Sequence, residues 1–237
     1  MVMSLLTIIQ NVTNETLLGE EPQTVVGNND KYVKKALALL NKVGKKLSAM
    51  HDWKVIQKEV TLTSNGTGSY SRSSVFTDGD FLRYINDTDW DRSNYRKMSL
   101  VTPQEWQVLK SSVVTNVGII RYYREQDNNI LITPDETGDT IVFEYISKNW
   151  ITDASGTTTK AAFTADDDEV RFPQFLMELG LKYELKAGDG LPSAVELKEF
   201  EDAREDLIAA ETPKRIIGPK YNYNTRNPNL PDTGVGL

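Results

Sequence analysis

The sequence lacks the residues on which several kinds of active site depend. Among its 237 residues there is no cysteine and a single histidine, His51. Without cysteine the chain can form no disulfide, thiolate nucleophile, iron–sulfur cluster or cysteine-ligated zinc site. One histidine rules out a two-histidine metal site within one subunit. We therefore expect no cofactor and no metal, and the composition favours a protein that is not an enzyme.

Positive charge and long apolar runs are also scarce. The chain holds 27 Lys and Arg against 34 Asp and Glu, which gives a net charge of −7, whereas tight binding to DNA needs a basic surface that displaces counterions. No apolar run approaches the roughly 20 residues of a membrane span. Residues 1–12 contain an apolar cluster but no basic residue ahead of it, so we do not expect a signal peptide. A protein that is made in the cytoplasm and does not act at a membrane is the expectation.

What the sequence does contain is helical periodicity toward both ends. Apolar residues recur at spacings of three and four in ranges near 4–14, 31–51, 172–187 and 193–211, as they do along one face of a helix. Ser4 and Asp30 stand where N-caps are expected. The sequence therefore predicts a helical bundle built from both ends of the chain.

The middle of the chain alternates instead with period two. Strands are predicted near 56–63, 81–85, 119–124, 130–133 and 140–148, and Thr102-Pro103-Gln104-Glu105 predicts one intervening helix. The expected fold class is α+β. Residues 1–52 and 160–212 would form the helical bundle, 53–159 an inserted and mainly antiparallel β module, and the proline-rich residues 213–237 an extended C-terminal arm.

The exposed faces of two predicted helices have opposite charge. The helix near 31–51 carries lysines, and the helix near 193–211 carries seven acids against two bases. These faces could be merely solvated, or they could meet within a subunit or across a subunit boundary. Our hypothesis for subunit contacts is the set Lys34, Lys35, Lys42, Lys45, Glu199, Asp202, Glu205 and Asp206.

The segment 213–237 has apolar, aromatic and basic side chains that are typical anchors on a partner surface. They are Ile216, Ile217, Tyr221, Tyr223, Arg226 and Leu230. A frayed tail and a partner-docking arm are equally compatible with the sequence.

Other polar groupings have ordinary interpretations. Asp87, Asp89 and Asp91 have the spacing of the first EF-hand ligands, but Arg92 replaces the turn glycine and Met98 replaces the closing glutamate. The acidic run 166–169 is interpreted as the start of a helix, and His51 as a structural residue at a helix end. Paired carboxylates could serve a glycosidase without cysteine or histidine, but no spacing singles out a pair.

A series of short motifs occurs in a fixed order between Lys31 and Ala210. It comprises His51-Asp52-Trp53, Gly79-Asp80-Phe81, Ile85 to Arg92, Thr102 to Trp106, Asp139 to Trp150, Phe163 to Asp168, Phe172-Pro173 and Leu179 to Tyr183. The ordered set resembles the head-to-tail adaptor proteins, also called head completion or connector proteins, of tailed bacteriophages. The chain departs from that family at Thr77-Asp78-Gly79, where a Leu-Pro pair is usual, and in its C-terminal segment.

The resemblance implies a structural virion protein at the head–tail interface, or neck. It implies a homo-oligomeric ring, usually dodecameric, that joins the portal protein to a tail tube, nozzle or tail fibre protein. Double-stranded DNA would pass through the ring without specific binding, and the protein would be made in the host bacterial cytoplasm. A virion-associated peptidoglycan hydrolase, or a tail or neck structural protein elsewhere in the virion, are the alternatives.

Overall fold

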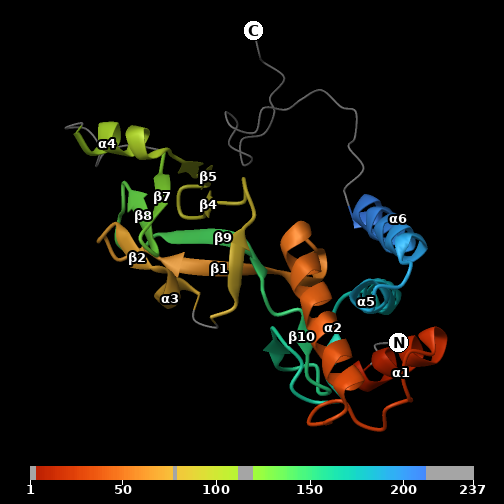
Figure 1. The fold of residues 1–237 in the computed structure, drawn as a ribbon. Helices are drawn as coiled ribbons and strands as arrows, with labels where there is room; N and C mark the ends of the chain where they lie inside the picture. The colour runs from red at the N-terminus through yellow and green to blue at the C-terminus, as the bar shows by residue number, and fades with distance from the viewer. Residues whose placement is uncertain (1–3, 77–78, 112–119, 212–237) are drawn as a thin grey trace, which may run out of the picture. The chain divides into compact units, whose positions relative to one another are not determined.

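The computed structural model of the chain describes residues 4–76, 79–111 and 120–211, which form two compact units (Figure 1). One unit, here the helical unit, contains residues 4–57 and 146–211. The other, the β unit, contains the described residues between 58 and 145. The chain therefore has the mixed α+β composition that the sequence predicts.

The division between the units differs from the predicted one. Residues 146–159 were assigned to the β module, but they cluster with the helices. The physical reason is Trp150, which is fully buried and packs against Phe163 and Phe172 in the helical unit. Residues 53–57 also belong to the helical unit, because Trp53 packs edge-on against Phe172.

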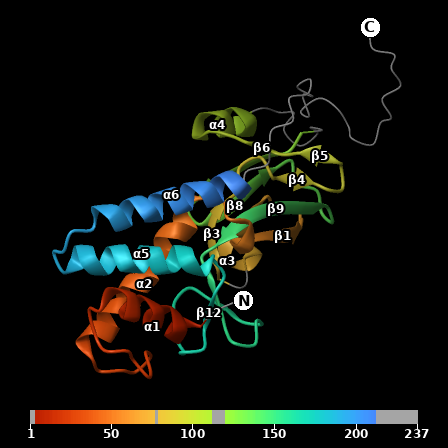
Figure 2. The ribbon, with the colours of Figure 1, turned by 90° about the vertical axis from the view of Figure 1, so that its right-hand side faces the viewer.

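Four helices make up most of the helical unit (Figures 1 and 2). They are α1 (Leu5–Thr16), α2 (Lys31–Met50), α5 (Gln174–Gly188) and α6 (Ala194–Glu211), with the short 3-10 turn η1 at Lys54–Ile56. Ser4 accepts a hydrogen bond from the Thr7 amide, and Asp30 accepts from the amides of Tyr32 and Val33, so both predicted N-caps are present. No helix among the described residues is long and apolar enough to cross a membrane.

Two glycines of these helices allow close packing, Gly44 against a buried tryptophan and Gly180 against two neighbouring helices. A Cβ atom at Gly44 would lie 2.3 Å from the ring of Trp150, and one at Gly180 would lie 2.7 Å from Val43 and 3.0 Å from Phe200. Helix α5 therefore contacts α2 on one side and α6 on another. Glycine is unfavourable inside a helix by about 1 kcal/mol relative to alanine, and here it is used where a larger residue would clash.

A small sheet completes the helical unit. Strand β10 (Ile151–Thr152) lies between β11 (Thr159–Lys160) and β12 (Glu169–Val170), antiparallel to both. The acidic run 166–169 lies in the turn before β12 and at the first residue of that strand rather than at a helix start, which corrects the prediction. Asp168 accepts hydrogen bonds from the Thr164 and Ala165 amides, and Asp166 from the Val25 and Val26 amides.

Two sheets form the β unit. The first has the order β1-β9-β4-β5, with β3 also paired to β9, and the second has the order β2-β8-β7-β6. The strands are β1 (Gln57–Thr63), β2 (Ser69–Ser71), β3 (Phe81–Tyr84), β4 (Trp90–Asp91), β5 (Arg96–Lys97), β6 (Ser99–Leu100), β7 (Tyr122–Gln126), β8 (Asn129–Thr133) and β9 (Thr140–Ser147). The pairs β4–β5, β4–β9, β2–β8 and β7–β8 are antiparallel, and β6–β7 is parallel.

Two short helices accompany these sheets, α3 (Arg72–Val75) and α4 (Pro103–Ser111). Helix α4 begins with the predicted capping box. The Thr102 amide donates to the Glu105 carboxylate at 2.7 Å, and the Glu105 amide donates to the Thr102 hydroxyl at 3.3 Å.

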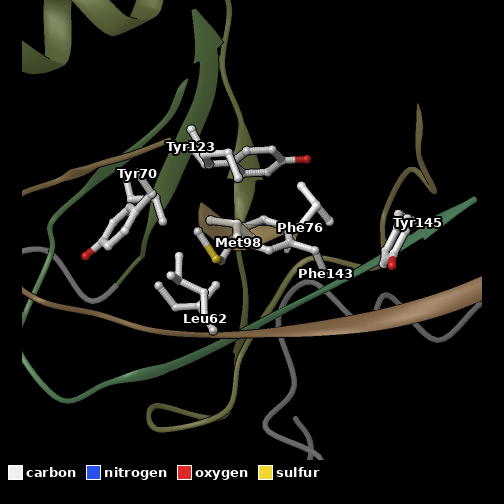
Figure 3. Packing of buried hydrophobic residues seen from close by; sticks show 11 residues of the cluster. Leu62, Tyr70, Phe76, Met98, Tyr123, Phe143 and Tyr145 are labelled. Atoms are coloured by element: carbon white, nitrogen blue, oxygen red, sulfur yellow. The ribbon is translucent and has the colours of Figure 1, made fainter. Parts of the chain in front are cut away.

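The core of the β unit is rich in aromatic residues (Figure 3). Ile141, Phe143 and Tyr145 lie on one face of β9, as their alternation predicts, and join the buried cluster. Tyr123 of β7 packs into the same cluster, and so does Met98, which lies between β5 and β6. The ring of Phe143 contacts Tyr123 edge-on at a centroid distance of 5.6 Å. This core positions the three tyrosine hydroxyls described below.

Candidate functional site

Five of the six lysines of α2, all except Lys31 in its first turn, divide into two sets that lie on different faces of the helix. Lys42 and Lys46 follow Lys35 by seven and eleven residues, which places the three lysines on one face. Lys34 and Lys45 are also eleven residues apart and share the neighbouring face with Ala38. We call Lys34, Ala38 and Lys45 the outer α2 face, and all three residues are exposed.

The first set makes ion pairs with α5 and its C-terminal end. Lys42 and Lys46 donate to the two carboxylate oxygens of Glu184 at 2.7 and 2.5 Å, and Lys35 donates to Asp189 at 2.5 Å. Burial alone would raise the pKa of Glu184, but the two lysines hold that pKa below its usual value. Two of the predicted subunit-contact residues, Lys35 and Lys42, are thus engaged within the chain.

The outer α2 face is less engaged. Lys34 donates to the Asn29 side chain at 2.9 Å. The Lys45 ammonium makes no hydrogen bond or ion pair with any other residue that the structure describes. These two lysines present positive charge that α5 does not neutralise.

Helix α6 carries an acidic stripe along one face. Val195, Glu199, Asp202 and Asp206 follow the spacing i, i+4, i+7 and i+11, so they form a single line along the helix. All four are exposed, and the Val195 side chain is 66% exposed. Within the described ranges, Glu199, Asp202 and Asp206 form neither a hydrogen bond nor an ion pair. We call this line of three acids, together with Val195 at its start, the acidic stripe.

The remaining predicted acid, Glu205, lies on a different face from the stripe. Its carboxylate is exposed and approaches Arg204 of the same helix at 3.8 Å. None of the four predicted acids of α6 pairs with an α2 lysine in the part of the chain that the structure describes. The two charged faces are therefore not neutralised by each other in one copy.

Glu184 and Asp189, the intramolecular partners of the lysines, were not predicted from the sequence. Glu184 is nearly buried and follows the close-contact residue Gly180 by one helical turn. That spacing places Glu184 on the side of α5 that meets α2. A charged residue inside an apolar stripe was the signal that could have identified it.

The three carboxylates with EF-hand spacing diverge in the structure. Asp87 is exposed and pairs with Lys97 at 2.5 Å, Asp89 is buried beside Tyr123, and Asp91 pairs with Arg121. Among the described residues, no group of three or more potential ligands is placed to hold a metal ion.

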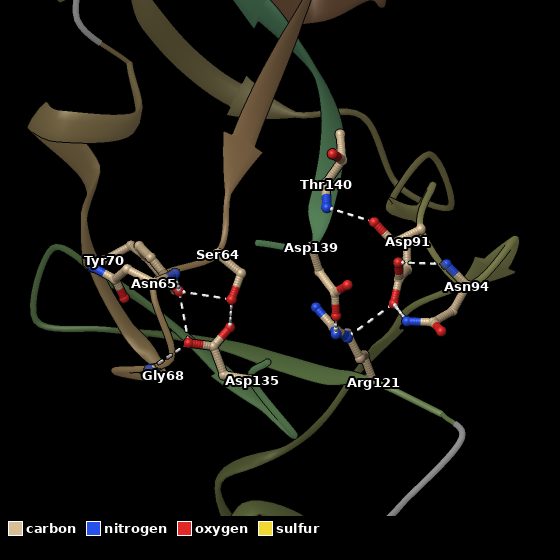
Figure 4. Close-up of polar contacts among 11 residues, drawn as sticks. Ser64, Asn65, Gly68, Tyr70, Asp91, Asn94, Arg121, Asp135, Asp139 and Thr140 are labelled. Carbon is tan, nitrogen blue, oxygen red and sulfur yellow. Dashed lines mark hydrogen bonds and ion pairs between the residues drawn. The ribbon is translucent and has the colours of Figure 1, made fainter. Parts of the chain in front are cut away.

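Three acids of the β unit, the buried Asp80 and Asp89 and the half-buried Asp135, are bonded to tyrosine hydroxyls of the aromatic core. The Tyr70, Tyr123 and Tyr145 hydroxyls donate to Asp135, Asp89 and Asp80 at 2.6, 2.7 and 2.9 Å. Asp135 also accepts from the Ser64 hydroxyl and from the Gly68 amide (Figure 4). Asp80 accepts in addition from Lys58 at 2.6 Å. These acids accept hydrogen bonds from donors inside the β unit, which is a structural use of carboxylates.

Arg121 forms the other buried charged cluster of the β unit (Figure 4). Its side chain is only 3% exposed and contacts two acids, Asp91 through Nε at 2.9 Å and Asp139 through Nη2. Asp91 also accepts from the amide and side chain of Asn94 at 3.0 and 2.9 Å. The cluster links three segments that are far apart in the sequence.

The single histidine lies at the end of α2, as predicted. His51 packs edge-on against Trp53 at 5.0 Å and lies 3.8 Å from Glu211. The Trp53 indole donates to the Leu47 carbonyl at 2.7 Å. His51 thus belongs to the packing around the α2 C-terminus.

The proposed arm lies outside the described residues. This applies to each of its predicted anchors, Ile216, Ile217, Tyr221, Tyr223, Arg226 and Leu230. Thr77 and Asp78, where the motif series departs from the adaptor family, are outside as well.

No protein-family model matches the chain, and no curated protein matches it significantly.

Proposed function

We propose that the chain is a head-to-tail adaptor: a structural virion protein that assembles into a dodecameric ring, joins the portal to the tail and continues the DNA channel. The proposal starts from the ordered motifs that resemble this family. We also propose that the four long helices act as the adaptor bundle and that residues 213–237 form an arm that docks on the portal.

The observation that carries the proposal is the pair of oppositely charged surfaces on the helical unit. A closed ring needs two different complementary surfaces on each subunit, because each copy meets one neighbour with one surface and the next neighbour with the other. The acidic stripe and the outer α2 face meet this requirement. Their charges are exposed and are not used against each other within one copy.

Charge also suits the proposed channel. The net charge of −7 disfavours adhesion of DNA, because carboxylates repel phosphates. Exposed α6 acids outside the acidic stripe, such as Glu201 and Glu205, would add to this repulsion where they line the passage. An adaptor of this kind needs DNA to pass and not to bind.

The state of the carboxylates favours the structural proposal over the hydrolase. A glycosidase needs one acid with a raised pKa that reaches the substrate. Burial raises the pKa of Asp89, although the Tyr123 hydroxyl opposes part of this effect. Asp89 lies in the β core, however, where its carboxylate accepts from that hydroxyl and is not exposed to a substrate.

Mixing the purified protein with portal rings of the same virus tests the proposal. Native mass spectrometry and negative-stain images should show a twelve-subunit ring on the portal, even if the free protein is monomeric, because assembly can depend on the partner. Deletion of 213–237 should abolish co-sedimentation while circular dichroism stays unchanged. A ring of three or six subunits would instead indicate a tail component, and clearance of cell-wall substrate would indicate the hydrolase.

A further inference from the structure

The β unit carries an exposed apolar groove. It lies between α4 and the β6–β7 edge of the second sheet and has a volume of about 360 Å³. Its lining residues are Val101, Gln104, Glu105, Val108, Leu109 and Tyr122. We call it the α4 groove, and α4 is labelled in Figure 1.

Apolar exposure around this groove is unusually high. Val108, which lines the groove, is 63% exposed, and Leu100 and Ile120, which are close in sequence to the lining residues Val101 and Tyr122, are 60% and 47% exposed. Single exposed apolar residues are ordinary, but several beside one hollow typically mark a binding surface. The groove volume is near the lower end of the range for binding pockets, about 300–1,000 Å³, so it suits a pair of side chains better than a helix.

The strand beside the groove is suited to an extended peptide. Strand β6 is the last strand of the order β2-β8-β7-β6 among the described residues. The Ser99 and Val101 amides donate to the Arg121 and Tyr123 carbonyls of the β7 side at 2.9 and 3.1 Å. Alternation along a strand then directs the backbone groups of Leu100 to the opposite edge. On that edge the Met98 amide already donates to the Asp89 carbonyl at 3.0 Å, whereas the backbone groups of Leu100 make no hydrogen bond on that edge among the described residues. A peptide that lies along this edge could pair with the backbone while its side chains enter the groove.

We propose that the occupant of the α4 groove is the segment 220–226 of this chain, with Tyr221 and Tyr223 inserted as paired anchors. In an extended segment residues i and i+2 point to the same side, so these tyrosines form a doublet. Lys220 and Arg226 flank them, and the carboxylate of Glu105 on the groove supplies the complementary charge. No proline interrupts residues 220–227, so their backbone amides can pair with an edge strand.

The length of chain after α6 allows the contact in one copy or between two. Tyr221 lies ten positions after Glu211, which corresponds to a reach of at most about 36 Å. A groove within that reach would be filled by the same copy, and a more distant one by the segment of a second copy. The inference goes beyond the proposed adaptor function, because it concerns only copies of this chain. The other predicted anchors, Ile216, Ile217 and Leu230, would remain available to bind a portal.

The absence of cysteine makes a direct test straightforward in the full chain. Val108→Cys in the groove is combined with Asn222→Cys between the two tyrosines, and a short bismaleimide links the thiols. The matched control places the first cysteine at Thr61, an exposed residue of β1 in the same unit that does not line the groove. Thermal melting confirms that each variant is folded.

The groove pair should crosslink at least about tenfold faster than the control pair, because docking raises the effective concentration of the two thiols. Adding Tyr221→Ser and Tyr223→Ser should return the groove pair to the control rate. The mass of the product shows whether one copy or two are joined, and either result supports the contact. Equal rates for the two pairs, or a rate that does not depend on the tyrosines, would overturn the proposal.

Discussion

The buried acids of the β unit and the acidic stripe of α6 use their carboxylates in opposite ways. In the β unit, Asp80, Asp89 and Asp91 are buried and accept hydrogen bonds or ion pairs from donors inside the unit. In the helical unit, the acids of the acidic stripe face outward and are unpaired within the described residues. Counting acids in the sequence cannot distinguish these uses. The difference indicates that the buried charges of the β unit maintain the fold, whereas the charges of the acidic stripe are available to a partner.

The largest effect on stability is expected from Arg121→Leu in the β unit. This substitution leaves Asp91 and Asp139 without their shared cation, and an uncompensated buried charge costs about 3–5 kcal/mol. Urea unfolding at pH 7 measures the loss. The matched control is Arg92→Leu, since Arg92 is exposed and pairs with Glu59 at 2.8 Å, a contact worth about 0–1 kcal/mol. Similar losses for both variants would contradict the contrast between buried and exposed charge.

A pH-dependent effect is expected for Asp89→Asn. Burial raises the pKa of Asp89 in the native protein, with partial opposition from the Tyr123 hydroxyl and Lys97. The native state therefore holds this proton more tightly than the unfolded chain does, and stability falls as the pH rises from the unfolded pKa of about 3.9 through the native pKa. Asparagine does not titrate, so the variant should gain stability relative to the wild type between pH 3.5 and 7.

Urea unfolding of both proteins at the two pH values gives this difference. Asp87→Asn removes an exposed carboxylate two residues away and serves as the control. A relative stability of Asp89→Asn that falls with pH would show that Asp89 is stabilised in its charged form, contrary to the account.

A smaller effect of opposite sign is expected for Glu184→Gln in the helical unit. Lys42 and Lys46 hold the pKa of Glu184 below its usual value despite its burial. Their contribution is therefore present above the unfolded pKa of about 4.3 and disappears as the pH falls through the lower native pKa. At pH 7 the loss should be about 1 kcal/mol or less, because both lysines are half-exposed.

The difference between wild type and Glu184→Gln should shrink when unfolding is repeated near pH 3.5. Glu201→Gln, on the exposed side of α6, should change stability little at either pH. A loss that is independent of pH would mean that Glu184 acts through packing and not through its charge.

Local signals explain which parts of the fold were predictable. The helix starts at Ser4, Asp30 and Thr102 depend on residues within one turn, and all three caps are present. Strands β4, β5, β6, β10, β11 and β12 were missed because each has only two residues and is defined by its pairing partner. The Tyr70–Asp135 and Tyr145–Asp80 pairs each join residues 65 positions apart, so no local pattern could indicate them.

The charged surfaces were predictable in part. Opposite charge on the helices near 31–51 and 193–211 was evident from the sequence, but the distribution of the lysines over two faces of α2 was not used. The spacing of Lys35, Lys42 and Lys46 already separates them from Lys34 and Lys45. That Glu184 would neutralise the first set depends on how α5 packs against α2, which is a tertiary property.

The central claim is that the acidic stripe of one copy meets the outer α2 face of the next, and a mixing experiment tests it most directly. One variant carries Asp202→Lys and Asp206→Lys, and the other carries Lys34→Glu and Lys45→Glu. Each substitution is on the surface and should alter the free energy of unfolding by no more than about 0.5 kcal/mol. Oligomer mass is measured by native mass spectrometry on portal rings, for each variant alone and for an equimolar mixture.

Each variant alone places like charges across every subunit boundary, so neither should form a ring. In the mixture, alternating copies restore opposite charges at each boundary, and an even-numbered ring of both variants should assemble. Full assembly by either variant alone, or no assembly by the folded mixture, would contradict the account.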